Sequence, residues 1–117
     1  MLGVAGVVLY SAIVGQKTAT LELPGVPLGL LEGVRYDELQ FCLEPGQTLI
    51  LASDGAMEAL NIKGEFYDID RFTESISRHA DKDVGELLRS LYTDVRQFIG
   101  SAELSDDITM IALRRKR

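Results

Sequence analysis

Two acidic sites lie beside the most apolar runs of the chain. Asp54 follows the run at 48–53, and the pair Asp106 and Asp107 comes directly before the run at 108–113. A carboxylate held against an apolar strand is costly unless a cation or a hydrogen-bond donor compensates its charge. Adjacent aspartates also repel one another, and a divalent cation relieves that repulsion. The pattern therefore indicates a metal site at the ends of two buried strands.

The ligand atoms of such a site would all be carboxylate oxygens. These favour Mg²⁺ or Mn²⁺ over zinc, since zinc usually takes His or Cys. Two such ions about 3.5–4 Å apart can activate water and polarise a phosphoryl oxygen. A structural interpretation stays open, because Asp-Gly is a common turn dipeptide and paired aspartates can cap a strand in a solvated loop. His79, the only histidine, follows Arg78 at an expected helix end, where we expect a solvated cation rather than a general base.

The composition describes a small acidic globular domain. The chain has 117 residues, of which 46% are hydrophobic and 26% charged, and its net charge is −6. This length suits one domain, and the acidic balance argues against sequence-independent binding of nucleic acid. The single cysteine, Cys42, excludes an internal disulfide and a thiolate zinc cluster. It favours a cytoplasmic setting, with Cys42 as a small buried hydrophobe.

Residues 1–15 carry no charge but do not resemble a targeting segment. A secretory signal would begin with basic residues, and a membrane-spanning helix needs roughly 20 apolar residues. Gly3, Gly6 and Ser11 interrupt this valine-rich run. We therefore expect a buried strand here and no membrane partner.

The expected elements are strands first, then two helices, then one returning strand. Residues 1–53 are predicted to be mainly strands, at 4–14, 18–23, 36–43 and 48–53, with a turn-rich connection at 24–31 and a turn at 44–47. Residues 69–99 are predicted to form two helices, the first capped by Asp68 or Asp70. The closing strand is expected at 108–113. The two most apolar strands, 48–53 and 108–113, are expected to be buried on both faces.

The second helix has the clearest pattern. Its apolar residues recur at helical spacing at Val84, Leu87, Leu88, Leu91, Val95 and Phe98. Asp81 or Asp83 can cap its start and Gly100 can end it, so the helix is expected from Val84 to Ile99. Strands followed by helices and a returning strand predict an α+β fold, with helices layered on a mostly antiparallel sheet.

The segments around the acidic sites resemble the motifs of one enzyme family. The run Leu-Ile-Leu-Ala-Ser-Asp-Gly-Ala-Met-Glu-Ala at 49–59 is similar to the strand and Asp-Gly motif of bacterial metal-dependent protein phosphatases of the sporulation stage II protein E type, in the protein phosphatase 2C superfamily. Other blocks stand in that family's order: Pro-Leu-Gly-Leu-Leu at 27–31, Gly-Glu-Phe-Tyr at 64–67 with Asp-Arg-Phe at 70–72, and Ser-Asp-Asp-Ile-Thr at 105–109. The blocks cover most of the chain from residue 24 onward.

The resemblance implies a layered αββα sandwich flanked by helices, of which residues 1–117 form about half as a single partial domain. It implies that Asp54 and Asp106 are direct metal ligands, that Asp107 orients or supplements them, and that Gly55 allows close backbone approach. The implied cofactors are Mn²⁺ or Mg²⁺ in a two-metal site. The implied reaction is hydrolysis of phosphoserine or phosphothreonine by activated water, on a small regulatory protein of the anti-anti-sigma-factor type.

Two motifs of the family lack a counterpart in this sequence. One is an Asp in a Gly- and His-rich segment, whose carboxylate bridges the two metals. The other is Asn-Ala-Gly-His, for which the nearest match is Val-Ala-Gly-Val at 4–7. We therefore expect the isolated chain to be inactive or nearly so.

Other hypotheses remain open. The chain could be a non-catalytic regulatory or interaction module that forms homo-oligomers through exposed sheet edges. It could also be an α+β domain whose acidic pairs are only structural. Under every hypothesis the basic run at 114–117 is expected to be a frayed, solvated end.

Overall fold

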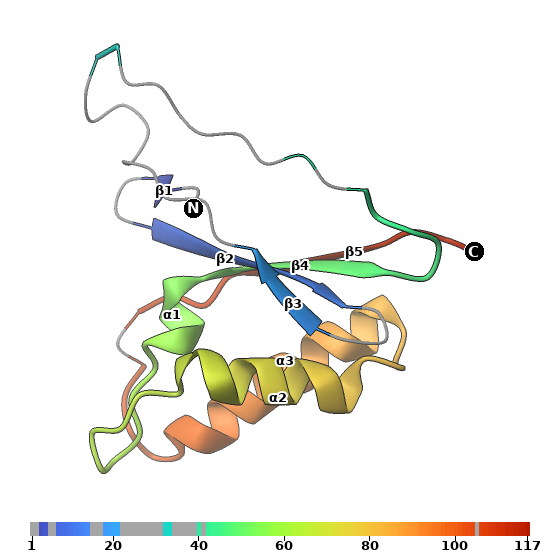
Figure 1. Cartoon of the computed structure of the whole chain (residues 1–117). Helices are drawn as coiled ribbons and strands as arrows, with labels where there is room; N and C mark the ends of the chain where they lie inside the picture. Colours follow the sequence, from blue (N-terminus) through green and yellow to red (C-terminus); the bar gives the residue numbers. More distant parts are fainter. Residues whose placement is uncertain are drawn as a thin grey trace.

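The computed structural model describes residues 3–4, 7–14, 18–21, 32–33, 40, 42–104 and 106–117. These ranges contain one sheet and three helices (Figure 1). The connection expected at 24–31 lies outside the described residues. The strand expected at 36–43 is described only at 40, 42 and 43, and none of these residues is in a strand.

All strand pairs of the sheet are antiparallel. The strands are β1 (Gly3–Val4), β2 (Val7–Val14), β3 (Thr18–Leu21), β4 (Thr48–Ser53) and β5 (Met110–Arg114). The order across the sheet is β1-β2-β4-β5, and β3 also pairs with β2. β2 and β4 are therefore the two central strands, and β4 pairs with β2 on one side and with β5 on the other.

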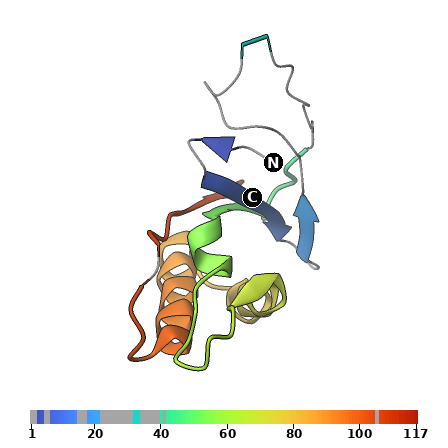
Figure 2. The same cartoon turned by 90° about the vertical axis from the view of Figure 1, so that its left-hand side faces the viewer.

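Two long helices, α2 (Asp68–His79) and α3 (Val84–Ile99), lie on one face of the sheet (Figures 1 and 2). A short helix, α1 (Asp54–Met57), follows β4 directly. The sequence predicts both long helices, and α3 has the expected bounds, whereas α1 was not expected. Within the described ranges, no helix has the length and apolar content that a membrane crossing requires.

Asp83 caps the start of α3 and Gly100 ends it, as expected, whereas the N-cap position of α2 is Tyr67, which makes no side-chain capping bond. The Asp83 carboxylate accepts a hydrogen bond from the Glu86 N–H at 2.9 Å, and Gly100 ends α3 with a φ of 61°. At the start of α2, Asp68 has a φ of 60°, and its carboxylate accepts from the Arg71 N–H at 3.1 Å. Aspartate tolerates this left-handed conformation better than most residues.

The core lies between the sheet and the two long helices. Its largest fully buried apolar side chains come from β4, α2 and α3: Ile50, Phe72, Ile76, Leu87, Leu91, Val95 and Ile99. Ala56 of α1 is also fully buried. The leucine-rich stripe of α3 is therefore packed core, as its spacing predicts. This packing holds β4, and with it the start of α1, in a defined position.

On the opposite face of the sheet, β4 and β5 present apolar side chains. Leu49 of β4 is opposite Leu113 of β5, and Leu51 is opposite Ile111, so the four side chains share one face. Ile111 is 57% exposed and Leu113 is 60% exposed. We call these four residues the outer apolar face. The expectation of burial on both faces is wrong for β5, because no described element packs against this side.

Arg114 is not part of a frayed end. Its guanidinium donates hydrogen bonds to Thr48 Oγ1 and to the carbonyls of Ala80 and Lys82, at 2.7–3.1 Å. The side chain thus ties the last residue of β5 to the first residue of β4 and to the segment after α2. The expectation of a frayed basic run is wrong at this position, since the carbonyls that end α2 lie within its reach.

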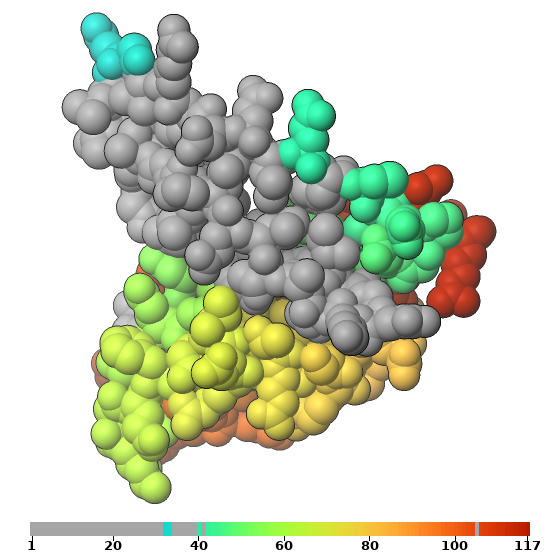
Figure 3. Space-filling model, in the orientation of Figure 1, coloured from blue at the N-terminus to red at the C-terminus, as the bar shows by residue number. Residues whose placement is uncertain are grey.

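The turn expected at 44–47 is present. The Gln47 N–H donates to the Glu44 carbonyl at 3.0 Å, and Gly46 has a φ of 87°. The backbone of Arg115 pairs with this turn through two hydrogen bonds, and Figure 3 shows the C-terminal residues beside it. Cys42, expected to be buried, is exposed, because it precedes the turn in irregular structure rather than on the inner face of the sheet.

Candidate metal centre at the end of the central strand

The two acidic segments meet where β4 ends. Ser53 is the last residue of β4 and the N-cap position of α1, with φ −73° and ψ 161°. Asp54 is the first residue of α1, and its side chain is partly buried. The segment that carries Asp106 and Asp107 leads into β5, which is paired with β4. The sheet therefore brings the two segments together from positions about fifty residues apart in the chain.

Gly55 contacts the second segment directly. A Cβ atom built on Gly55 would lie 2.0 Å from the carbonyl oxygen of Asp107 and 3.0 Å from its carbonyl carbon. No side chain fits at that distance, so glycine is required by close backbone approach. This contact holds the backbone of α1 against the Asp107 peptide.

Ser53 links the same two segments by hydrogen bonds. Its backbone N–H donates to the Thr109 carbonyl at 2.9 Å, and its hydroxyl oxygen accepts from the Thr109 N–H at 3.0 Å. The hydroxyl also donates to the Asp107 carbonyl at 3.5 Å. Since a side chain takes the Thr109 N–H, regular pairing stops there. The closing strand therefore begins at Met110 rather than at the expected residue 108.

The three candidate ligands differ in exposure. Asp54 is partly buried, whereas Asp106 and Asp107 are exposed. One carboxylate oxygen of Asp106 accepts from the Asp107 N–H at 2.8 Å, which turns that carboxylate toward its own backbone. Among the described residues, no three His, Cys, Asp or Glu side chains gather closely enough to form a metal-binding group.

These residues fit a hard divalent cation in their chemistry and backbone placement. All three candidates offer carboxylate oxygens, the donors that Mg²⁺ and Mn²⁺ prefer. The Gly55 contact brings their two segments together without an intervening side chain. Three carboxylates are fewer donors than the six or more that such a cation takes, so a metal centre here would need further ligands.

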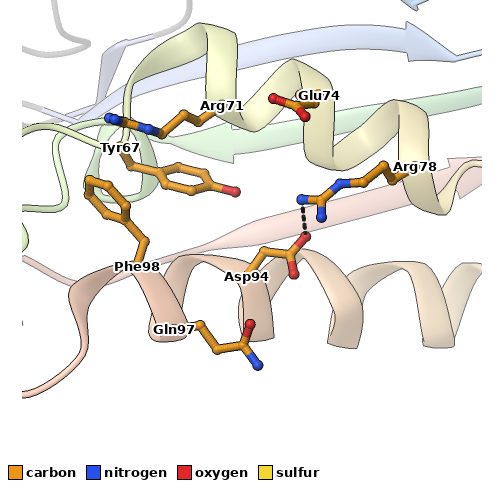
Figure 4. A pocket seen from close by; sticks show the side chains of 7 residues that line it. All are labelled: Tyr67, Arg71, Glu74, Arg78, Asp94, Gln97 and Phe98. Carbon is orange, nitrogen blue, oxygen red and sulfur yellow. Dashed lines mark hydrogen bonds and ion pairs between the residues drawn. The ribbon is translucent and has the colours of Figure 1, made fainter.

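A second polar centre lies between α2 and α3, away from the carboxylates of the metal centre. Asp94 of α3 accepts hydrogen bonds from the Ser75 hydroxyl and, at 3.1 Å, from Arg78 of α2, and its Oδ2 lies 3.0 Å from His79 Nε2. Figure 4 shows Asp94 directed at Arg78 across the two helices. His79 is therefore not the solvated side chain that was expected, because the packing of α3 places a carboxylate beside its ring and leaves the side chain 18% exposed.

This centre borders an open cleft of ≈ 400 Å³ (Figure 4). The residues around the cleft are Tyr67, Arg71, Glu74, Arg78, Asp94, Gln97 and Phe98. The Arg71 guanidinium lies 4.6 Å from the centroid of the Phe98 ring and donates to the Phe66 carbonyl, and Arg78 is paired with Asp94. Both cations already have partners, so the cleft is a feature of helix packing rather than a charged site for a ligand.

The contacts around Asp94 and Tyr67 also shift the pKa values of these two side chains. Burial raises the pKa of Asp94, but hydrogen bonds with Ser75 and His79 and the charge of Arg78 outweigh it, so this pKa lies below its ordinary value. Burial also raises the pKa of the Tyr67 phenol more than its hydrogen bond with Ser75 lowers it. The centre therefore holds a carboxylate and a neutral phenol at neutral pH.

Sequence reasoning missed both Ser53 and the Asp94 centre. A role for Ser53 could have been predicted from its position, because a serine that follows an apolar strand and precedes Asp-Gly can cap a helix or bridge strands. The Asp94 centre had no local signal, since its members are 15 to 19 residues apart along the chain.

The fold defines the class of protein. The chain resembles a solved structure, the SiaA-PP2C domain of Pseudomonas aeruginosa, with a TM-score of 0.75 and 21% sequence identity. The match covers 91% of this chain and 42% of that one. The chain therefore has part of a protein phosphatase 2C fold, and the predicted α+β class is confirmed.

The sequence identifies the family within that class. A family model for the stage II sporulation protein E (SpoIIE) matches residues 3–116. The chain belongs to this family, as its motifs indicate. Phosphoserine phosphatase RsbU of Bacillus subtilis (strain 168) is 30% identical over 96 residues, which are 82% of this chain and 28% of RsbU. The chain thus spans less than half the length of either relative.

Proposed function

We propose that this chain is part of a metal-dependent protein serine/threonine phosphatase and supplies one side of its metal centre. The observation that carries the proposal is the contact of Gly55 with the Asp107 carbonyl, which joins the family's Asp-Gly motif to its closing Asp-Asp motif. Membership of the SpoIIE family and the likeness to phosphoserine phosphatase RsbU support the reaction class. The hydrolysed bond is the phosphoester of a phosphoserine or phosphothreonine.

Each residue has a distinct part in this proposal. Asp54 and Asp106 would hold the cation directly, and Asp107 would orient or supplement them. Gly55 allows the two backbones to approach. When bound, Mn²⁺ or Mg²⁺ supplies Lewis acidity that activates water and neutralises phosphoryl charge. The protein's own contribution is to hold these carboxylates at the ends of β4 and β5, which the core makes rigid.

We further propose that the substrate is a phosphorylated regulatory protein of the anti-anti-sigma-factor type. The motif resemblance supports this, and the net charge of −6 argues against a nucleic-acid partner. A cytoplasmic setting stays a prediction from the single cysteine, Cys42. The sequence has no counterpart of the family's bridging-aspartate motif, so we expect weak metal binding and no useful turnover from these 117 residues alone.

The test is a Mn²⁺ titration of the chain and of single variants, followed by calorimetry or by the EPR signal of free Mn²⁺. Asp54→Asn and Asp106→Asn each keep side-chain size but remove a charged ligand, and each should weaken binding at least about tenfold. Asp81→Asn, in the loop before α3, is the matched control and should bind as the unaltered chain does. Equal affinity in all four proteins would refute the metal centre. Robust Mn²⁺-dependent phosphatase activity that Asp54→Asn abolishes would instead refute the expected inactivity.

A second candidate function is a non-catalytic interaction module that self-associates. The outer apolar face favours it, since Ile111 and Leu113 are 57% and 60% exposed on a strand at the end of the sheet order. Contiguous exposed apolar side chains on a sheet often mark an interface. The two functions differ in what they require: the phosphatase needs Asp54, and the module needs the outer apolar face.

A further inference from the structure

Ser53 has a side-chain contact that its local position does not explain. It occupies the N-cap position of α1, where a serine hydroxyl ordinarily accepts a hydrogen bond from an N–H of the first helical turn. No such capping bond forms here. The hydroxyl is instead directed at the segment before β5. The Ser53 hydroxyl therefore bonds to the neighbouring segment of the sheet and does not cap α1.

The contact joins the backbones next to the candidate metal ligands. The hydroxyl accepts the Thr109 N–H at 3.0 Å and reaches the Asp107 carbonyl at 3.5 Å. Ser53 is itself only 4% exposed and directly precedes Asp54. One buried side chain thus touches the segments that carry the two acidic motifs, and a hydrogen bond of this kind limits how far they can separate.

Gly55 of α1 contacts the same Asp107 carbonyl. A Cβ on Gly55 would lie 3.6 Å from Ser53 Oγ as well as 2.0 Å from the Asp107 oxygen. The Asp107 carbonyl oxygen therefore lies next to both the Ser53 hydroxyl and the space that a side chain at Gly55 would fill. The hydroxyl prevents the carbonyl from moving away, and the glycine permits it to come close.

We propose that Ser53 is a positioning residue that sets the separation between Asp54 and the Asp106 and Asp107 pair. This inference rests on the proposed metal centre and adds a residue that binds no metal. Groups that orient metal ligands through hydrogen bonds commonly change metal affinity about tenfold or more when they are removed. Ser53 acts in this way through the backbone of Asp107 and Thr109.

The experiment compares Ser53→Ala, which removes the hydroxyl, with Ser53→Thr, which keeps it. Ser75→Ala is the matched control, because it removes another buried serine hydroxyl, at the α2–α3 contact. Two quantities are measured in each protein: the Mn²⁺ affinity, and the hydrogen exchange of the Thr109 amide by NMR in the absence of metal.

We expect Ser53→Ala to weaken Mn²⁺ binding roughly tenfold. Exchange of the Thr109 amide should accelerate about five- to tenfold beyond any change in the core amides, the factor that one hydrogen bond supplies. Ser53→Thr should restore both values toward those of the unaltered chain. Ser75→Ala should lower overall stability but leave Mn²⁺ affinity unchanged. If Ser53→Ala does not fold, Ser53→Cys takes its place, since a thiol is a weak acceptor.

The outcomes separate this inference from the function on which it rests. Unchanged Mn²⁺ affinity in Ser53→Ala, while Asp54→Asn binds weakly, overturns the positioning role and leaves the metal centre intact. Absence of Mn²⁺ binding in the unaltered chain overturns the metal centre. In that case the exchange of the Thr109 amide still decides whether Ser53 holds the segment, and unchanged exchange overturns that claim.

Discussion

Replacement of Gly55 by alanine tests most directly whether the two acidic segments depend on close approach. The new Cβ would lie 2.0 Å from the Asp107 carbonyl oxygen, and 3.4 Å is the near limit of ordinary contact. The Asp107 peptide would have to retreat by about 1.4 Å, the difference between those two distances. The Ser53 hydroxyl contacts that same oxygen at 3.5 Å, already the outer limit of a hydrogen bond, so a retreat of that size breaks this contact.

The energetic cost follows from three effects. Overpacking costs about 1–3 kcal/mol. The lost hydrogen bond costs a further ~1 kcal/mol. The better helix propensity of alanine stabilises the folded chain by about 0.5–1 kcal/mol and partly offsets this loss. We therefore expect Gly55→Ala to lower the free energy of unfolding by about 1–3.5 kcal/mol, measured by urea denaturation, and to weaken Mn²⁺ binding.

Gly85→Ala is the control for this prediction. Gly85 is also a helical glycine, in the first turn of α3, but the nearest atoms to its added Cβ are 3.6 Å away and belong to flexible side chains. This variant should raise the free energy of unfolding by about 0.5–1 kcal/mol. If Gly55→Ala were as stable as Gly85→Ala and bound Mn²⁺ normally, the reasoning from close approach would be refuted.

Two further predictions concern the Asp94 centre and the outer apolar face. The pKa of Asp94 is lower in the folded chain than its ordinary value of 3.8. Its carboxylate therefore stabilises the fold fully at pH values above 3.8, and this stabilisation is lost as the pH falls through the lower folded-state pKa. Asp94→Asn should therefore lower the free energy of unfolding at pH 7 by about 1–3 kcal/mol and flatten its loss in acid; identical acid-unfolding curves would contradict this. Replacing both Ile111 and Leu113 with threonine should abolish concentration-dependent self-association, measured by size-exclusion chromatography with light scattering, without affecting Mn²⁺ affinity. A monomeric unaltered chain at high concentration would count against the interaction module.

Local sequence determined the two long helices of this protein and its family. The apolar spacing from Val84 to Phe98 and the caps at Asp83 and Gly100 placed α3 at its observed bounds, because helix periodicity and capping act over a few residues. The ordered motifs indicated the SpoIIE family before any fold was known. The family resemblance also implied close backbone approach at Gly55, since glycine is the residue that permits it.

Only the tertiary structure decided how the acidic segments meet and which side chains hold them. The pairing of β4 with β5 brings Gly55 against Asp107, and no local pattern encodes a contact between segments about fifty residues apart. His79 contacts Asp94 of α3, and Arg114 bonds to Thr48 of β4, whereas Ile111 is exposed. Packing between elements, and not local sequence, sets these surroundings. The sequence determined which chemistry the carboxylates can perform, and the fold determined where they stand, since metal binding depends on distances that only the folded chain defines.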